Sequence, residues 1–183
     1  MKNKIRRKAL ALGISLGVVL LGISAYSATT NILVEGAIPN SVFFEGPVKV
    51  TVRTLTIKPG EALPWHYHPG YAFNVVKSGT LTVEDGCGGE VTLTPGQGFE
   101  EIDSHVHRGK NVSNADVVVY DTFITRQGKP TTVTFPERRC GPPHEVDECK
   151  DDGWRKFTHP QNFISAEQCV SFVRDRRRNP KPL

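Results

Sequence analysis

Short runs of alternating and β-branched residues, separated by turns, fill the chain from about residue 31 to 135. Val48, Val50 and Val52 alternate with polar residues, and residues 117–124 form a longer apolar run. Glycine and proline mark turns between these runs, as at residues 85–89. Strands of this length and spacing are typical of an all-β sandwich or barrel. The sequence therefore predicts one β-domain, and it shows no internal repeat.

The first 27 residues have the three parts of a secretory signal peptide. A basic segment at residues 2–8 precedes an apolar run at residues 9–23, and Ala25 and Ser27 form a small-residue cleavage site before Ala28. A retained membrane anchor is the alternative, but the apolar run is shorter than the ~20 residues that a spanning helix needs. We therefore expect a secreted or periplasmic bacterial protein with no membrane partner after cleavage.

Removing this segment changes the charge of the chain. The full sequence has 23 Lys and Arg against 19 Asp and Glu, a net charge of +4. Residues 1–27 hold five of the basic residues and no acidic one, which leaves 18 basic and 19 acidic residues. The basic excess therefore belongs to the export signal, and we expect no nucleic-acid partner.

All four cysteines, Cys87, Cys140, Cys149 and Cys169, lie after the predicted cleavage site. An even count in an oxidising compartment favours disulfides over thiol catalysis or a thiolate metal site. Four cysteines allow three pairings, of which we favour Cys149 with Cys169 and Cys87 with Cys140.

The predicted organisation has three parts: a signal peptide of residues 1–27, a β-domain of residues 28–137 and a polar tail of residues 138–183. Within the tail, Ser165 and Gln168 form a capping-box pattern that opens a short amphipathic helix. Cys169 and Val173 lie on one face of that helix. A segment this small cannot bury enough surface to fold alone, so we expect a disulfide to staple it.

Three histidines are placed to meet at one point. His66 and His68 are two residues apart, so on a strand their side chains point the same way. His107 on a neighbouring strand would complete three imidazole ligands, with positions left for water or substrate. His144 and His159 lie in the tail, where we expect them to be solvated.

These histidines stand in two motifs that resemble those of the cupin superfamily, over roughly residues 31–135. Its first motif reads Gly, five residues, His-x-His, three or four residues, Glu, six residues, Gly; the matches here are Gly60, His66, His68 and Gly79, with Ala72 at the Glu position. The second reads Gly, five residues, Pro-x-Gly, two residues, His, three residues, Asn; the matches are Gly96, His107 and Asn111, with Ile102 and Ser104 in the Pro and Gly places. This register selects His107 rather than His105 as the third ligand. The tail is similar to a short Cys-containing motif appended to various exported bacterial proteins.

The resemblance implies a small β-barrel or jelly roll that holds a divalent transition metal (Fe, Mn, Ni or Zn). The metal ligands would be His66, His68 and His107. Cupin metals are commonly held by three His and one Glu, and Ala72 cannot ligate. Glu101 is the candidate replacement, because neighbouring strand residues face opposite sides and one of Glu100 and Glu101 points inward. The alternatives are a bare three-His centre, or a Glu101 that is exposed or only hydrogen-bonds a histidine.

Two functions follow from this resemblance. The first is a metal-dependent enzyme of the dioxygenase, isomerase or lyase type, in which Glu101 or Tyr71 transfers a proton to or from a small-molecule substrate. The second is a non-catalytic cupin that binds a small ligand or a metal and acts as a binding or sensing module. The missing carboxylate at Ala72 favours the second. Cupins often pair through sheet edges, so a homodimer is possible.

Overall fold

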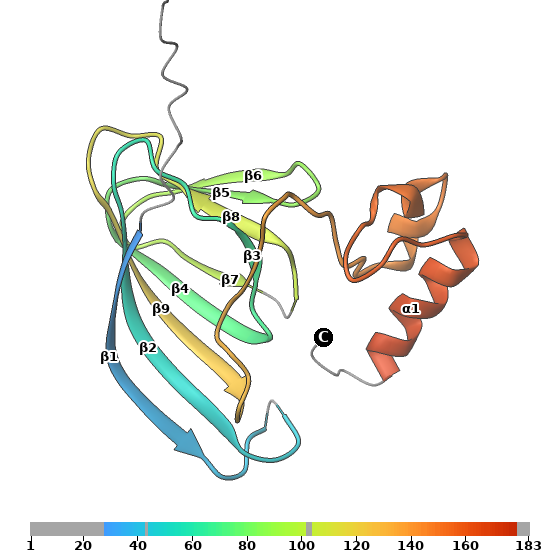
Figure 1. The fold of residues 1–183 in the computed structure, drawn as a ribbon, viewed down its shortest axis with the longest axis horizontal. Helices are drawn as coiled ribbons and strands as arrows, with labels where there is room; N and C mark the ends of the chain where they lie inside the picture. The colour runs from blue at the N-terminus through green and yellow to red at the C-terminus, as the bar shows by residue number, and fades with distance from the viewer. Residues whose placement is uncertain (1–27, 43, 102–103, 179–183) are drawn as a thin grey trace, which may run out of the picture.

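The computed structural model describes residues 28–42, 44–101 and 104–178, and the predicted signal peptide lies outside them. Two five-stranded antiparallel sheets make up the β-domain (Figure 1). The first contains, in spatial order, β1 (Ala28–Ile38), β2 (Val48–Ile57), β9 (Val117–Arg126), β4 (Gly70–Ser78) and β7 (Gly98–Glu101). The second contains β10 (Val133–Phe135), β3 (Trp65–Tyr67), β8 (His107–Lys110), β5 (Leu81–Asp85) and β6 (Glu90–Leu93). The predicted all-β jelly roll is confirmed. Among the described residues, no helix has the length and apolarity needed to cross a membrane.

The core lies between the two sheets and follows from strand alternation. Along β9 almost every second residue is buried, so the apolar run at residues 117–124 turns one face inward. Its inward valines meet side chains of both sheets; the cluster consists of Leu55, Ile57, Val76, Leu81, Leu93, Val117 and Val119. Phe123, farther along the same face of β9, packs against His68 with ring centroids 4.9 Å apart. The closed, apolar end of the domain therefore continues directly into a polar end that carries the histidines.

The tail forms a second small core beside the β-domain. Both expected disulfides are present, Cys87 with Cys140 and Cys149 with Cys169. Two 3-10 helices, η1 (Val146–Cys149) and η2 (Gly153–Lys156), and one helix, α1 (Ala166–Arg178), surround it. Its buried members are Cys140, Cys149, Phe157, Phe163, Cys169 and Val173. The predicted cap is observed: Ser165 Oγ accepts a hydrogen bond from the Gln168 amide at 3.2 Å, and α1 begins at Ala166, directly after Ser165.

Candidate metal centre

Three buried imidazoles meet where β3 and β8 pair. His66 lies on β3 directly opposite His107 on β8, and His68 follows the end of β3. Each of the three offers a ring nitrogen, and these atoms all lie within 4.8 Å of one another. The shared direction expected of residues 66 and 68 is therefore observed, as is the selection of His107. His105 points elsewhere, with its ring 5.5 Å from that of His144.

The backbone fixes the tautomer of every ring in the cluster. The Nδ1 atoms of His66, His68 and His107 lie 2.8, 2.6 and 2.8 Å from carbonyl oxygens of residues 64, 131 and 105. A carbonyl oxygen can only accept, so each Nδ1 carries the proton. In a neutral ring, each Nε2 then presents its lone pair. This arrangement is the usual support for metal-binding histidines, in which the second nitrogen donates to a fixed acceptor.

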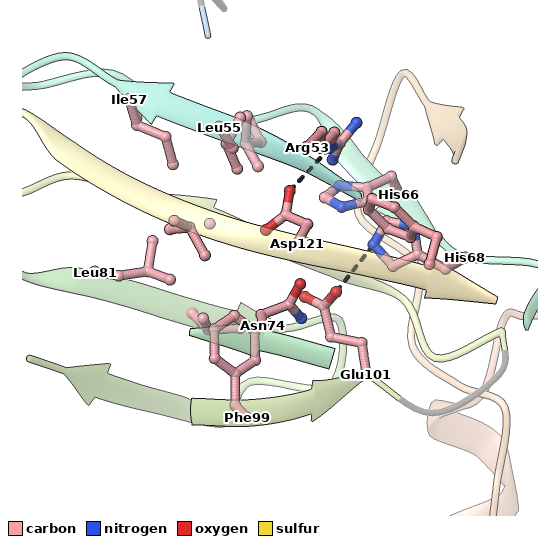
Figure 2. A pocket seen from close by; sticks show the side chains of 15 residues that line it. Arg53, Leu55, Ile57, His66, His68, Asn74, Leu81, Phe99, Glu101 and Asp121 are labelled. Carbon is pink, nitrogen blue, oxygen red and sulfur yellow. Dashed lines mark hydrogen bonds and ion pairs between the residues drawn. The ribbon is translucent and has the colours of Figure 1, made fainter. Parts of the chain in front are cut away.

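Glu101 closes the cluster from the other sheet. One of its carboxylate oxygens lies 3.0 Å from His68 Nε2 (Figure 2). The other lies 2.8 Å from His107 Nε2. The strand register explains this position, because Glu101 on β7 pairs with Ala72 on β4. Side chains directly opposite on antiparallel strands share a face, with Cβ atoms about 5 Å apart. A carboxylate from residue 101 therefore reaches the region that one from residue 72 would occupy.

Burial and the facing groups shift the pKa values of Glu101 and the histidines in different directions. Burial alone would raise the pKa of Glu101, but the imidazoles of His107 and His68 hold this pKa well below its usual range. Burial likewise opposes protonation of His107, and the Glu101 carboxylate overcomes it and raises the pKa of His107. The pKa of His66 is well below its usual range because of burial and the two neighbouring imidazoles. Glu101 and His107 thus each favour the charged form of the other.

These residues fit a divalent metal. His107 Nε2 is buried and lies 2.8 Å from Glu101, yet it has no hydrogen bond of acceptable geometry within the part of the chain that the structure describes. Three Nε2 lone pairs and a carboxylate converging in a buried space form an unfavourable arrangement unless a proton or a cation lies among them. Three nitrogen ligands and one oxygen ligand suit Zn, Fe, Ni or Mn.

The backbone next to the ligands is held by segments distant in sequence. Ser104, in the motif position of a glycine, takes a left-handed φ of +66° and donates its amide to His68 O at 3.0 Å. The Val106 amide donates to Gly141 O at 3.0 Å, and Val106 O accepts from the Gly86 amide at 2.7 Å. The start of the tail therefore fixes the residue before His107.

An internal cavity of about 30 Å³ opens between the cluster and the apolar core. That volume has room for roughly two water molecules. Its polar wall includes three residues that sequence reasoning missed, namely Arg53, Asn74 and Asp121 (Figure 2). Arg53 Nε donates to Asp121 Oδ2 at 2.8 Å, and burial raises the pKa of Asp121 to about 6 although Arg53 opposes the rise. Strand alternation along β2, β4 and β9 could have indicated these residues, since each is a polar residue on the face of its strand whose neighbouring positions are apolar and point inward.

Two expected placements need correction. Tyr71 lies on the face of β4 opposite Ala72, and its ring packs 5.4 Å from that of Phe44. Strand alternation thus turns it away from the histidines, and we remove it from the candidate site. The expected solvation of His159 is wrong, because its ring is buried 5.0 Å from that of Tyr67. The tail folds back onto β3, which a local reading of the sequence does not show.

Residues 53–123, which contain all three histidines and Glu101, match the family model described as Cupin domain. This chain contains a cupin domain. The match ends before the tail, and no curated protein sequence matches the chain significantly.

Solved structures similar to the cupin domain come from several bacteria. One is a conserved protein with a double-stranded β-helix domain from Klebsiella pneumoniae, at 17% identity over 62% of this chain and 89% of that one, with a TM-score of 0.48. A cupin-like protein from Thermotoga maritima has 18% identity over 73% of this chain and 86% of that one, with a TM-score of 0.45. A sugar phosphate isomerase from Silicibacter pomeroyi has 24% identity over 48% of this chain and 57% of that one, with a TM-score of 0.42.

Proposed function

We propose that this protein is an exported, metal-dependent cupin enzyme of the dioxygenase, isomerase or lyase type that acts on a small molecule. The observation that carries the proposal is the carboxylate of Glu101 at the Nε2 atoms of His68 and His107. The non-catalytic alternative drew its weight from the missing carboxylate at residue 72. Glu101 brings a carboxylate to this region from the paired strand, and this supports the enzyme over the binding module. The two disulfides favour an oxidising compartment and so support export.

The residues at the site would have different roles in binding the metal and in proton transfer. His66, His68, His107 and Glu101 would hold the metal, and the bound metal would supply a Lewis acid with positions open to substrate or water. Backbone carbonyls at the Nδ1 atoms keep the imidazoles oriented. Glu101 has two oxygens facing the ligands, so it can bind through one and accept a proton at the other. The apolar floor of the cavity limits the amount of water at the site.

Metal content tests this proposal directly. The wild-type protein recovered through its export route should contain about one transition-metal ion per chain. We expect His66→Ala and Glu101→Ala to weaken metal binding by at least the roughly 10–100-fold that loss of a supporting group costs. The double variant Ala72→Glu/Glu101→Ala restores a carboxylate from the opposite strand and should recover much of the affinity.

Three outcomes contradict parts of the proposal, and a fourth only defines where the carboxylate must stand. Wild-type affinity in His66→Ala would exclude the three-His centre. If Glu101→Ala loses metal affinity and the double variant does not recover it, the carboxylate must stand at residue 101. Unchanged metal binding in Glu101→Ala would remove Glu101 from the set of ligands. A metal-loaded protein that turns over no member of a panel of small organic acids, thiols and catechols would favour the binding-module alternative.

A further inference from the structure

Arg53 lines two cavities. It lines the 30 Å³ internal cavity beside His66 and His68, and it also lines a second cavity of about 240 Å³. His66 lines both cavities as well. The wall of the larger cavity therefore includes one metal-ligand candidate and one guanidinium.

The larger cavity has one charged side chain among the described residues that line it. The other members are apolar or carry hydroxyl groups: Ala28, Thr30, Leu55, Leu63, Pro64, His66, Thr132 and Thr134. The lining thus presents one positive charge, three hydroxyl groups and an apolar wall.

Asp121 orients Arg53 without using up its donors. Arg53 on β2 pairs in register with Asp121 on β9, and Nε donates to Oδ2 at 2.8 Å. The ring of Phe123 lies beneath the guanidinium, 4.5 Å from Cζ to the ring centroid. An arginine has five N–H donors in a planar fork, so a bond at Nε leaves the Nη pair for a second acceptor. Two parallel N–H groups match the two oxygens of a carboxylate.

We propose that the larger cavity binds a small monocarboxylate, with the carboxylate on the Nη groups of Arg53 and the apolar part against Leu55, Leu63 and Pro64. Asp121 already offsets part of the guanidinium charge, which favours a monoanion over a phosphate dianion. The rest of the molecule then lies toward His66 and the metal centre. This inference rests on the proposed function and names its substrate class.

The test compares each acid with its uncharged amide. We would measure the binding of benzoate against benzamide, and of 3-methylbutanoate against 3-methylbutanamide, to the zinc-loaded and the metal-free protein by calorimetry. Each acid should bind at least 10-fold more tightly than its amide. The variant Arg53→Gln/Asp121→Asn removes both partners of the buried pair together, which avoids an unpaired buried charge, and it should abolish the preference.

Lys49→Gln is the matched control, because it removes one positive charge from the same strand at an exposed ion pair with Glu35. It should keep the preference for the acids. Equal binding of acid and amide, no saturable binding of either acid, or a preference that survives in Arg53→Gln/Asp121→Asn would each overturn the proposal. Zinc content measured on the same samples separates this failure from failure of the metal centre. A preference lost in His66→Ala but kept in the Arg53 variant would mean that the acid binds the metal instead.

Discussion

Removal of the Cys87–Cys140 disulfide should destabilise the β-domain as well as the tail. This bond joins the β5–β6 turn to the start of the tail, across 53 residues that include β6 to β10. In the chain-entropy model, a loop of that length contributes about 4 kcal/mol to the free energy of unfolding. Cys87 is exposed, whereas Cys140 is buried in the core of the tail, so Cys87→Ala/Cys140→Ala also loses the packing of one buried sulfur atom.

The two tryptophans of the chain give separate readouts, since Trp65 lies on β3 and Trp154 lies on η2. Urea unfolding would be followed by fluorescence in Trp65→Phe and Trp154→Phe backgrounds. With a slope of ~2 kcal/mol per molar urea, a loss of about 4 kcal/mol shifts the midpoint by about 2 M. We expect that shift at Trp65, because the loop contains strands of both sheets.

The Cys149–Cys169 bond provides the comparison. It closes 20 residues within the tail, which corresponds to about 3 kcal/mol in the same model. Cys149→Ala/Cys169→Ala should therefore lower the midpoint reported by Trp154 and leave that of Trp65 near the wild-type value. A loss below about 1 kcal/mol at Trp65 on removing Cys87–Cys140 would refute the loop-closure reasoning. Equal shifts at Trp65 from both variants would show that the tail and the β-domain unfold as one unit.

Three further results are expected. Burial lowers the pKa of His159 to about 4, so the unfolded chain binds a proton at this residue at higher pH than the folded chain does. The free energy of unfolding should therefore fall as the pH drops from about 6.5 toward 4. His159→Phe should reduce this pH dependence in urea unfolding, and an unchanged pH dependence would contradict the lowered pKa. Asn111 is buried and its side chain bonds two carbonyl oxygens and the Ser113 amide, so Asn111→Ala should cost about 2–4 kcal/mol of thermal stability, and a loss below about 1 kcal/mol would contradict that role. Strand β1 exposes Ile32, Val34 and other apolar side chains on a sheet edge, so we expect a homodimer in analytical ultracentrifugation. The variant Ile32→Lys/Val34→Lys should dissociate this dimer. A wild-type protein that stays monomeric at high concentration would exclude pairing through β1.

Features that depend on neighbours along the chain could be predicted from the sequence. Alternation is a local property of an extended backbone, so it indicated the strands and the common direction of His66 and His68. It also indicated that Glu100 and Glu101 face opposite sides, and Glu101 is the one that reaches the histidines. The even number of cysteines after the predicted cleavage site favoured disulfides, and both favoured pairings are present.

The tertiary structure decided how the strands align and what the tail covers. Register between β4 and β7 placed Glu101 opposite Ala72, and no local pattern states which residues of two strands will pair. Alternation turned Tyr71 away from the site only once Ala72 was known to face inward. The pairing of β2 with β9 brought Arg53 to Asp121 across 68 residues. Local backbone geometry is set by the sequence nearby, whereas the contacts that complete this site depend on packing between segments far apart in the chain.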